Sequence, residues 1–247
     1  MGRSENLMVS YSQNYEDVLL WRLFQRQKSG FYVDVGAGHP VKDSVTRHFY
    51  LQGWNGINIE PNPKNFSLLK KDRARDINLP YAVSDQEGEA EFQFVSNDPN
   101  LSSLGKIPGE LVSEHALKVQ PHKVRVTTLS KIFEEQKVGK IDLLKIDVEG
   151  FEKQVLAGAA LDRYPPRVIV IESVAPKGDQ VVRDQWVDLL TRQDYLRVYF
   201  DGVNDYYVKS KDPEAVETFR LPLNANDRFI RAEFLKKKFL FRKLLGL

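Results

Sequence analysis

Short apolar runs alternate along the chain with segments in which apolar residues recur at helical spacing. The runs that predict strands lie at 31–35, 56–60, 77–83, 88–95, 123–127, 141–148 and 168–172. Helical spacing predicts helices between them, at 44–52, around 66–69 and at 129–136, 151–159 and 181–192. Two more β-rich segments, 195–200 and 206–209, flank a turn and predict an antiparallel hairpin. This order predicts a doubly wound α/β sheet of mostly parallel strands that closes with the hairpin.

Residues 96–122 interrupt the alternation. The segment holds three prolines and much Ser, Gly and Asn, and it is the longest irregular stretch that the pattern leaves. Loops of this length in compact domains are usually functional or disordered. We therefore expect a substrate pocket to be shaped by Ser102 in this segment and by Asp201 and Asn204 in the hairpin turn.

The first predicted strand runs into a turn that contains two glycines, Gly36 and Gly38. Glycines here let the backbone approach a ligand at the carboxyl edge of the sheet. The third glycine of a dinucleotide fingerprint is missing, because Val41 stands in its place, and Asp34 precedes the turn. A carboxylate there repels a pyrophosphate but attracts the ammonium and sulfonium of S-adenosylmethionine (SAM), by roughly 1–4 kcal/mol at about 4 Å. The turn therefore favours SAM over NAD; the alternative for Asp34 is a turn or capping carboxylate.

Two more acids follow predicted strands. Glu60 ends the second strand, about 20 residues after the glycine turn, where an acid accepts hydrogen bonds from ribose hydroxyls. Asp85 follows the third strand, where an acid could reach an adenine amino group. The alternatives are a surface glutamate before a proline-rich turn and an aspartate in a turn before Gly88.

A third group of acids lies at the ends of the two most apolar strands. Asp147 and Glu149 follow the run 141–148, and Glu172 ends the run 168–172. Carboxylates at the end of a buried strand are costly unless that edge opens into a site. We therefore expect these three acids at the ligand crevice, with capping of the next helix as the alternative for Asp147 and Glu149.

Four segments together resemble the FkbM family of SAM-dependent methyltransferases: Tyr11–Asp17 (YSQNYED), 33–38 (VDVGAG), 53–63 (GWNGINIEPNP) and 142–152 (DLLKIDVEGFE). The resemblance runs from about residue 10 to about residue 209. It implies a class I, Rossmann-like sheet of seven strands and O-methylation, often of sugars or polyketide-type hydroxyls. The residues that it implies in the SAM pocket are Asp34, Gly36, Gly38, Glu60 and Asp147. It also implies that residues 1–28 form a cap over the cofactor, in which the segment 11–17 folds over the methionine end of SAM with Gln13, Glu16 and Asp17 as candidate contacts.

A hydroxyl acceptor benefits from a general base within hydrogen-bond reach, because its own pKa lies far above 7. The candidates for this catalytic role are Glu149, Glu172, His39 and Asp201. No repeated spacing of metal ligands occurs, so no metal site is predicted. The implied partner is a hydroxylated small molecule or glycan.

Composition and charge narrow the remaining possibilities. The 247 residues include no cysteine, which excludes disulfides, thiol nucleophiles and iron–sulfur ligation. The net charge of +2 divides into −4 for residues 1–227 and +6 for residues 228–247. The acidic body disfavours nucleic acid, and we divide the chain into a catalytic domain, 1–227, and a basic tail, 228–247. The tail is rich in Phe and Leu and predicts contact with an anionic membrane surface, with packing on the same protein as the alternative.

Two rival functions stay open on the sequence alone. The first is a nicotinamide-dependent oxidoreductase, because Tyr207 and Lys211 have the spacing of a Tyr–Lys proton-transfer pair. The second is a non-catalytic protein that keeps the fold to bind a ligand or a membrane surface. The chain has no apolar run long enough to span a membrane and no secretory signal, so we expect a cytoplasmic protein that contacts membranes at most through its tail.

Overall fold

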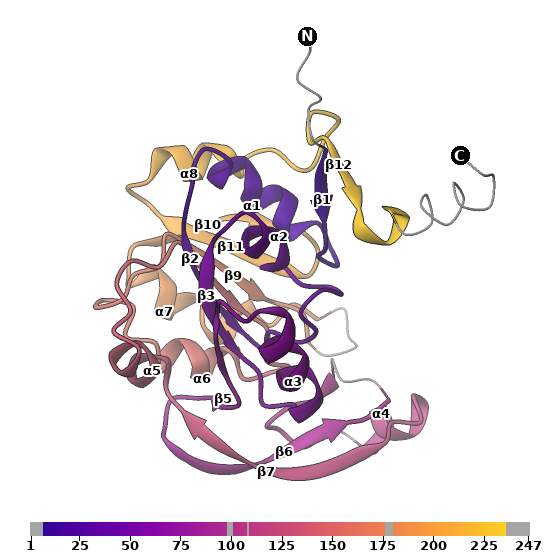
Figure 1. Cartoon of the computed structure of the whole chain (residues 1–247). Helices are drawn as coiled ribbons and strands as arrows, with labels where there is room; N and C mark the ends of the chain where they lie inside the picture. Colours follow the sequence, from indigo (N-terminus) through magenta and orange to yellow (C-terminus); the bar gives the residue numbers. More distant parts are fainter. Residues whose placement is uncertain (1–6, 98–100, 108, 176–179, 236–247) are drawn as a thin grey trace, which may run out of the picture.

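The computed structural model describes residues 7–97, 101–107, 109–175 and 180–235. Seven strands form the central sheet, in the order β10-β11-β9-β8-β2-β3-β4. Their bounds are β2 Phe31–Val35, β3 Asn55–Ile59, β4 Ile77–Leu79, β8 Leu143–Ile146, β9 Val168–Glu172, β10 Tyr195–Phe200 and β11 Asn204–Lys209. The strands β2, β3, β4, β8 and β9 run parallel, and β11 runs antiparallel to both of its neighbours. The predicted doubly wound sheet with a closing hairpin is therefore confirmed (Figure 1).

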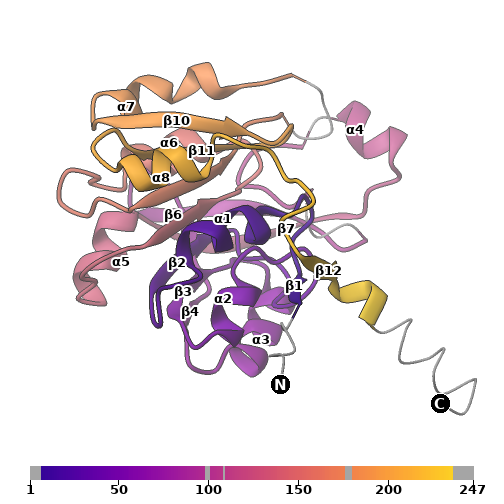
Figure 2. The ribbon, with the colours of Figure 1, turned by 90° about the horizontal axis from the view of Figure 1, so that it is seen from above.

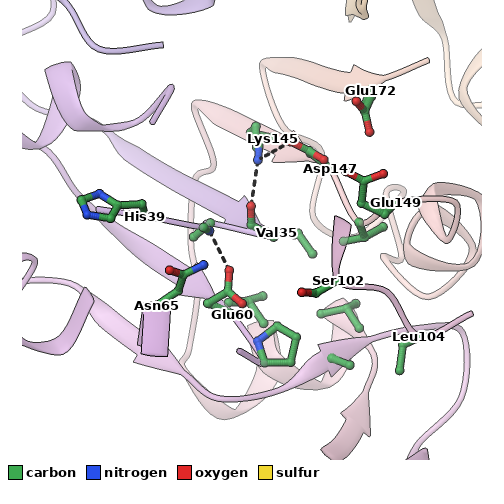
Figure 3. A pocket seen from close by; sticks show the side chains of 18 of the residues that line it. Val35, His39, Glu60, Asn65, Ser102, Leu104, Lys145, Asp147, Glu149 and Glu172 are labelled. Carbon is green, nitrogen blue, oxygen red and sulfur yellow. Dashed lines mark hydrogen bonds and ion pairs between the residues drawn. The ribbon is translucent and has the colours of Figure 1, made fainter. Parts of the chain in front are cut away.

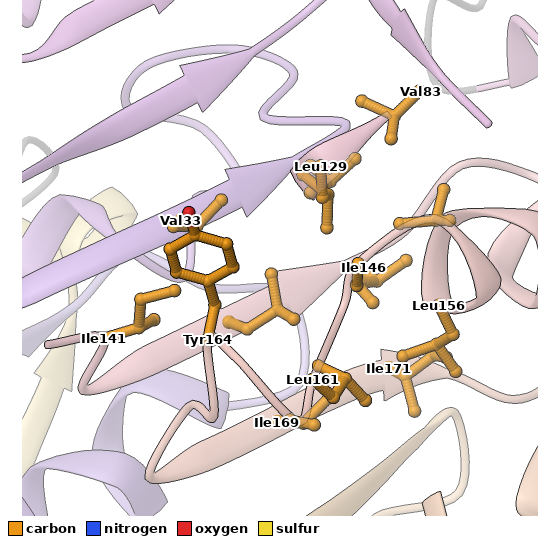
Figure 4. Close-up of a cluster of buried hydrophobic side chains, with 14 of the residues drawn as sticks. Val33, Val83, Leu129, Ile141, Ile146, Leu156, Leu161, Tyr164, Ile169 and Ile171 are labelled. Carbon is orange, nitrogen blue, oxygen red and sulfur yellow. The ribbon is translucent and has the colours of Figure 1, made fainter. Parts of the chain in front are cut away.

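Helices cover both faces of this sheet, because its inner strands are apolar on both sides. Alternate residues of one strand belong to different cores: Val33 of β2 packs in one cluster and Tyr32 in the other. The first core is closed by α5 Leu129–Glu135, α6 Glu152–Ala157 and α7 Val187–Thr191 (Figure 4). The second is closed by α1 Glu16–Phe24, α2 Arg47–Leu51 and α8 Pro213–Thr218. This two-sided burial holds the parallel strands in register and aligns their carboxyl ends.

Local sequence sets where several helices begin. The helix α3, Pro63–Asp72, starts with proline, and the Asn62 side chain accepts hydrogen bonds from two backbone amides of its first turn. Thr128 caps α5 in the same way, through the backbone N–H of Lys131. The helix expected over 181–192 is instead a 3₁₀ turn, Arg183–Gln185, followed by α7, because Trp186 between them leaves the helical conformation.

A second sheet of three strands lies beside the first, below it in Figure 1. It pairs β5 Ala82–Val83 and β6 Gly88–Val95 with β7 Val119–Thr127. The single strand predicted over 77–83 was wrong, because the chain changes sheets at Pro80, which has no N–H to continue a ladder. The segment 96–122 is also more regular than expected, since it contains α4 Gly109–Glu114 and the first residues of β7.

The two ends of the described chain meet in a small parallel sheet. β1, Met8–Ser10, pairs with β12, Phe229–Arg231 (Figure 2). The first residues of the predicted tail are therefore joined to the N-terminal segment, whereas residues 236–247 lie outside the described residues. Within the described part of the chain, no helix is long and apolar enough to cross a bilayer.

Candidate functional site

The carboxyl ends of β2, β3, β8 and β9 meet at one edge of the central sheet, where a cavity opens. The space between its protein atoms, the open mouth included, is about 960 Å³. Asp147, Glu149 and Glu172 lie at one end of this cavity, and Glu60 lies with Asn65 at the other (Figure 3). The three-stranded sheet closes one side with apolar residues: Ala82, Val83 and Phe92. The site thus has an apolar wall on one side and acids at both ends.

The glycine turn forms part of the wall of the cavity. Gly36 has a φ of +72°, and a Cβ placed there would lie 1.8 Å from the backbone oxygen of Asp147. No side chain fits in that space, so glycine is required where β2 passes the end of β8. Gly38, with a φ of +59°, then aims its N–H at a neighbouring carboxylate. The conformation of the turn is therefore set both by the backbone that follows β8 and by the acid that follows β3.

That carboxylate belongs to Glu60, the acid predicted at the ribose position. Its Oε2 accepts from the Gly38 N–H at 2.7 Å, and its Oε1 accepts from the Asn62 N–H at 2.7 Å. Each oxygen keeps a second lone pair for a ligand hydroxyl. Burial raises the pKa of Glu60 to about 7, against the two amide hydrogen bonds, which lower it.

Asp34, expected to contact the cofactor, does not line the cavity. The side chain is buried, accepts from the Thr46 hydroxyl at 2.7 Å and lies 3.5 Å from the ammonium of Lys145. The sequence argument assigned the neutralising charge to a ligand, but the protein supplies its own cation from the neighbouring strand. Asp34 therefore acts on the site indirectly, through its ion pair with Lys145, which lines the cavity.

Lys145 joins the two strands between which the cavity opens. Its ammonium donates to the Gly36 carbonyl at 2.9 Å and pairs with Asp147 at 3.2 Å (Figure 3). Burial opposes its charge, but Asp147 and Asp34 together raise the pKa of Lys145 above its usual range. It is a fixed cation that orients the Asp147 carboxylate and the glycine turn at once.

The acid end gathers carboxylate oxygens of Asp147, Glu149 and Glu172 within 4.8 Å of one another. Burial, followed by the charges of Asp147 and Glu149, raises the pKa of Glu172 well above its usual range. Glu172 therefore holds a proton at neutral pH and can donate it in a hydrogen bond.

Glu149 sits in a strained turn between β8 and α6. Its φ of +53° is uncommon for a residue with a side chain, and such conformations cost about 1–3 kcal/mol and cluster at functional sites. The Ser103 hydroxyl donates to the Glu149 carbonyl at 2.9 Å, and Glu152 accepts from the backbone N–H of Val148 and of Gly150. The turn is thus held both by the segment that follows β6 and by the start of α6.

The third catalytic candidate, His39, lies on the opposite side of the cavity. Its Nδ1 accepts from the backbone N–H groups of Val41 and Lys42, at 3.1 and 3.0 Å. Burial lowers the pKa of His39, so the ring is neutral, and the hydrogen is then on Nε2. His39 can donate a hydrogen bond to a ligand but has no free lone pair with which to take a proton.

The model of the methyltransferase FkbM domain matches residues 34–197. The chain belongs to this family. It is therefore a SAM-dependent methyltransferase, and its sheet is the class I, Rossmann-like sheet of such enzymes. No curated protein matches the sequence.

Solved structures similar to this FkbM-domain protein are distant in sequence. A TehB-like SAM-dependent methyltransferase from Corynebacterium glutamicum is 13% identical, with a TM-score of 0.40 over 79% of this chain and 88% of the other. An O-methyltransferase from Bacillus cereus, in complex with SAH, is 12% identical, with a TM-score of 0.41 over 81% and 82%. The precorrin-6y C5,15-methyltransferase from Geobacter metallireducens is 14% identical, with a TM-score of 0.42 over 85% and 94%.

Most of the residues predicted for the FkbM site line the cavity: Gln13, Gly36, Gly38, His39, Glu60, Ser102, Asp147, Glu149 and Glu172. Asp85 does not; it is exposed in a turn beside Gly158. Glu16, Asp201 and Asn204 do not line it either, and instead contact one another near the hairpin turn. Tyr207, half of the suggested Tyr–Lys pair, is buried in the first core cluster.

Lys145 and Asn65 also line the FkbM site but were not predicted from the sequence. Lysine in a strand that is apolar on both faces was a signal for Lys145, since a buried ammonium needs paired acids. Asn65 lies in the first turn of α3, just after Glu60, where a side chain can reach a ligand held by that acid.

Proposed function

We propose that this enzyme transfers a methyl group from SAM to a hydroxyl oxygen of a sugar, a glycan or a related small molecule. The observation that carries the proposal is the acid end of the cavity, where Asp147, Glu149 and Glu172 converge. When bound, SAM supplies a methyl group on a sulfonium, which a nucleophilic oxygen can attack. A hydroxyl is a poor nucleophile until a base takes its proton, and carboxylates at this end suit that role.

The residues of the cavity fit SAM along its length. Glu60 keeps lone pairs for the ribose hydroxyls, and the wall formed by β5 and β6 offers an apolar surface to the adenine. Asp147, held by Lys145, faces the opposite end, where the ammonium of the cofactor would find a carboxylate. The backbone of the glycine turn allows close approach between the two ends.

Among the candidates for the general base, Glu149 is the residue that we propose. The proton held by Glu172 and the occupied Nδ1 of His39 disfavour both of those residues at neutral pH. Glu149 lines the cavity on a turn that Ser103 holds. Ser102 also lines the cavity and is a candidate to orient the acceptor.

The proposal is tested in two steps. Calorimetry should detect binding of SAM and none of NAD. Mass spectrometry of hydroxylated acceptors incubated with labelled SAM should then find a label that stays on oxygen. The substitution Glu149→Gln should lower the turnover about 10²-fold or more while SAM still binds, and the exposed Glu87→Gln serves as a control. Transfer to nitrogen, or binding of NAD alone, would contradict the proposal.

We also propose that the basic tail contacts an anionic membrane surface. Arg228 and Arg231 begin the tail, Phe234 and Leu235 are exposed at 47% and 39%, and the sequence continues with five basic residues over 236–247. The full chain should float with vesicles that contain phosphatidylserine and not with pure phosphatidylcholine. A chain that ends at Leu235 should lose this binding, and unchanged flotation would count against the tail. The cytoplasmic location stays a prediction.

A further inference from the structure

The segment 10–15, here called the strap, folds around one buried carboxylate. Asp17, at the start of α1, accepts hydrogen bonds from the hydroxyls of Ser10 and Ser12 and from the N–H of Tyr11, each at 2.7 Å. All three donors belong to the strap, so a carboxylate that is out of water fixes its backbone. Gln13 stands at the turn of the strap and lines the cofactor cavity.

The hairpin turn holds the strap from one side. The side chain of Asn14 donates to the Asp201 carbonyl at 3.0 Å, and that of Asn204 donates to Glu16 Oε1 at 3.1 Å. Glu16 Oε2 closes the loop by accepting from the Asn14 N–H at 2.8 Å. Glu16 and Asn204 are both buried, so breaking this contact leaves polar groups without water. We call these four residues the clasp.

The clasp stands near the acid end of the cavity. Asn204 is paired with Glu172 in the register of β11 and β9, so the clasp adjoins an acid that lines the cavity. On its other side the strap meets β12, because the ring of Tyr15 lies 5.1 Å from that of Phe229, and Arg231 lies over it at 5.5 Å. The strap is therefore fixed from two directions, at the end opposite Glu60.

Gln13 itself is left free for a ligand. Its side chain is exposed at the cavity, and its carboxamide has no hydrogen-bond partner among the residues that the structure describes. A carboxamide offers two donor hydrogens and an acceptor oxygen. The amino-acid end of SAM carries both a carboxylate and an ammonium, so one neutral side chain can serve either group.

The family resemblance predicts Gln13 at the methionine end of the cofactor; we propose that Asn204 and Glu16 are positioning residues that act on the binding of that end through Gln13. This rests on the cofactor site proposed above. It gives Asp201 and Asn204 a different role from the substrate contacts predicted from the sequence, because the backbone carbonyl of Asp201 and the side chain of Asn204 hold the strap in place. Preordering the backbone leaves only the Gln13 side chain to be immobilised when the cofactor binds.

A double-mutant cycle read by calorimetry tests the proposal. The probe is S-adenosylhomocysteine, compared with methylthioadenosine, which has the nucleoside but lacks the amino-acid end. Gln13→Ala should weaken the homocysteine compound about tenfold, and Asn204→Ala about fivefold. In the Gln13→Ala background, Asn204→Ala should add nothing, since the residue through which it acts is gone. Methylthioadenosine should bind all variants as it binds the wild type.

The outcomes separate this inference from simpler readings. Additive losses would mean that Asn204 does not act through Gln13, and an unchanged affinity in Gln13→Ala would remove the proposed contact. If Asn204→Ala also weakens methylthioadenosine, its role is general folding and the inference fails. Amide exchange over residues 11–15 should speed up in Asn204→Ala but not in Asn224→Ala, an exposed asparagine outside the clasp. If wild-type protein binds neither probe, the proposed cofactor site itself is wrong.

Discussion

Glu60 couples the cofactor site to pH. Burial, the largest cause, raises its pKa from 4.5 to about 7; Lys145 lowers it and Asp34 raises it by smaller amounts. A proton therefore competes with any ligand that needs the carboxylate. The affinity for SAM should fall as the pH drops through 7, becoming about tenfold weaker at pH 6 than at pH 8. Calorimetry at the two pH values measures the change.

The variant Glu60→Gln separates this effect from other titrations. A carboxamide cannot lose a proton, so its SAM affinity should be lower and nearly the same at both pH values. Glu87→Gln, an exposed change on the turn before β6, should keep the wild-type profile. A slope that persists in Glu60→Gln would assign the titration to another acid.

Glu172 should make the protein less stable as the pH rises. Its pKa is raised in the folded state, chiefly by burial, so the folded chain keeps a proton that the unfolded chain releases above its ordinary pKa of 4.5. Glu172→Gln is neutral in both states and avoids that cost. The variant should match wild type near pH 4.5 and melt higher at pH 8, by at least about 2 °C for 1 kcal/mol.

Thermal unfolding at a series of pH values measures the difference between the two proteins. A Glu172→Gln protein that melts lower than wild type by the same amount at every pH would mean that Glu172 is ionised and paired. The buried Glu172 carboxyl lines the cavity, but keeping it protonated lowers the stability of the fold as the pH rises. Function and stability therefore place opposite demands on the acid end.

At the scale of elements, one buried arginine joins α3 to the loop that follows the glycine turn. The Arg73 guanidinium donates to the Pro40 carbonyl at 2.9 Å and to the Ser44 hydroxyl at 2.9 Å, and lies 3.9 Å from Asp76. Arg73→Met leaves Asp76 buried without its cation. It should lower the free energy of unfolding by about 3–5 kcal/mol in urea titrations.

The exposed Lys71→Met, two residues earlier in α3, is the matched control and should change stability by no more than about 0.5 kcal/mol. Adding Asp76→Asn to Arg73→Met should recover part of the loss, because the unpaired charge is then gone. If the single and double variants are equally unstable, the packing of Arg73 matters more than its charge.

The sequence predicted those elements whose signals are local. The strands β2 and β9 were expected at the residues where they occur, because a strand covered on both faces reads as one apolar run. β1 and β12 have only three residues each and are stabilised by a partner more than 200 positions away, so no local pattern marks them. The change of sheet at Pro80 likewise depends on which strands are neighbours.

In the site too, features with a local sequence signal could be predicted, and features that depend on distant partners could not. Glu60 and the acids after β8 and β9 could be predicted because the carboxyl ends of parallel strands meet at one edge. The partner of Asp34 could not, since Lys145 reaches it only after β2 and β8 pair. Asp201 and Asn204 were expected to shape the substrate pocket, but neither lines the cavity, and their contacts with the N-terminal strap require the folded hairpin.

At the scale of the whole molecule, segments near both ends of the described chain lie beside the cofactor cavity. β1 leads into the strap that carries Gln13, and β12 pairs with β1 and contacts Tyr15 of the strap. Arg22 of α1 also binds Asp227, just before β12. The basic segment begins at residue 228, but the folded part of the chain extends at least through β12, which ends at Arg231. The boundary in charge is therefore not a boundary of the fold.

Two truncations test this arrangement. A chain that ends at Asp227 keeps the Arg22 contact but loses β12, so β1 is left without its partner strand. We expect it to melt about 2–4 °C lower, as for a loss of 1 kcal/mol in a domain of this size, and to bind S-adenosylhomocysteine several-fold more weakly, because the strap loses one of its two supports. A chain that ends at Leu235 keeps β12 and should match the full chain in both measurements. Equal melting and equal affinity for the two truncations would show that β12 is dispensable, and the clasp alone would then hold Gln13 at the cavity.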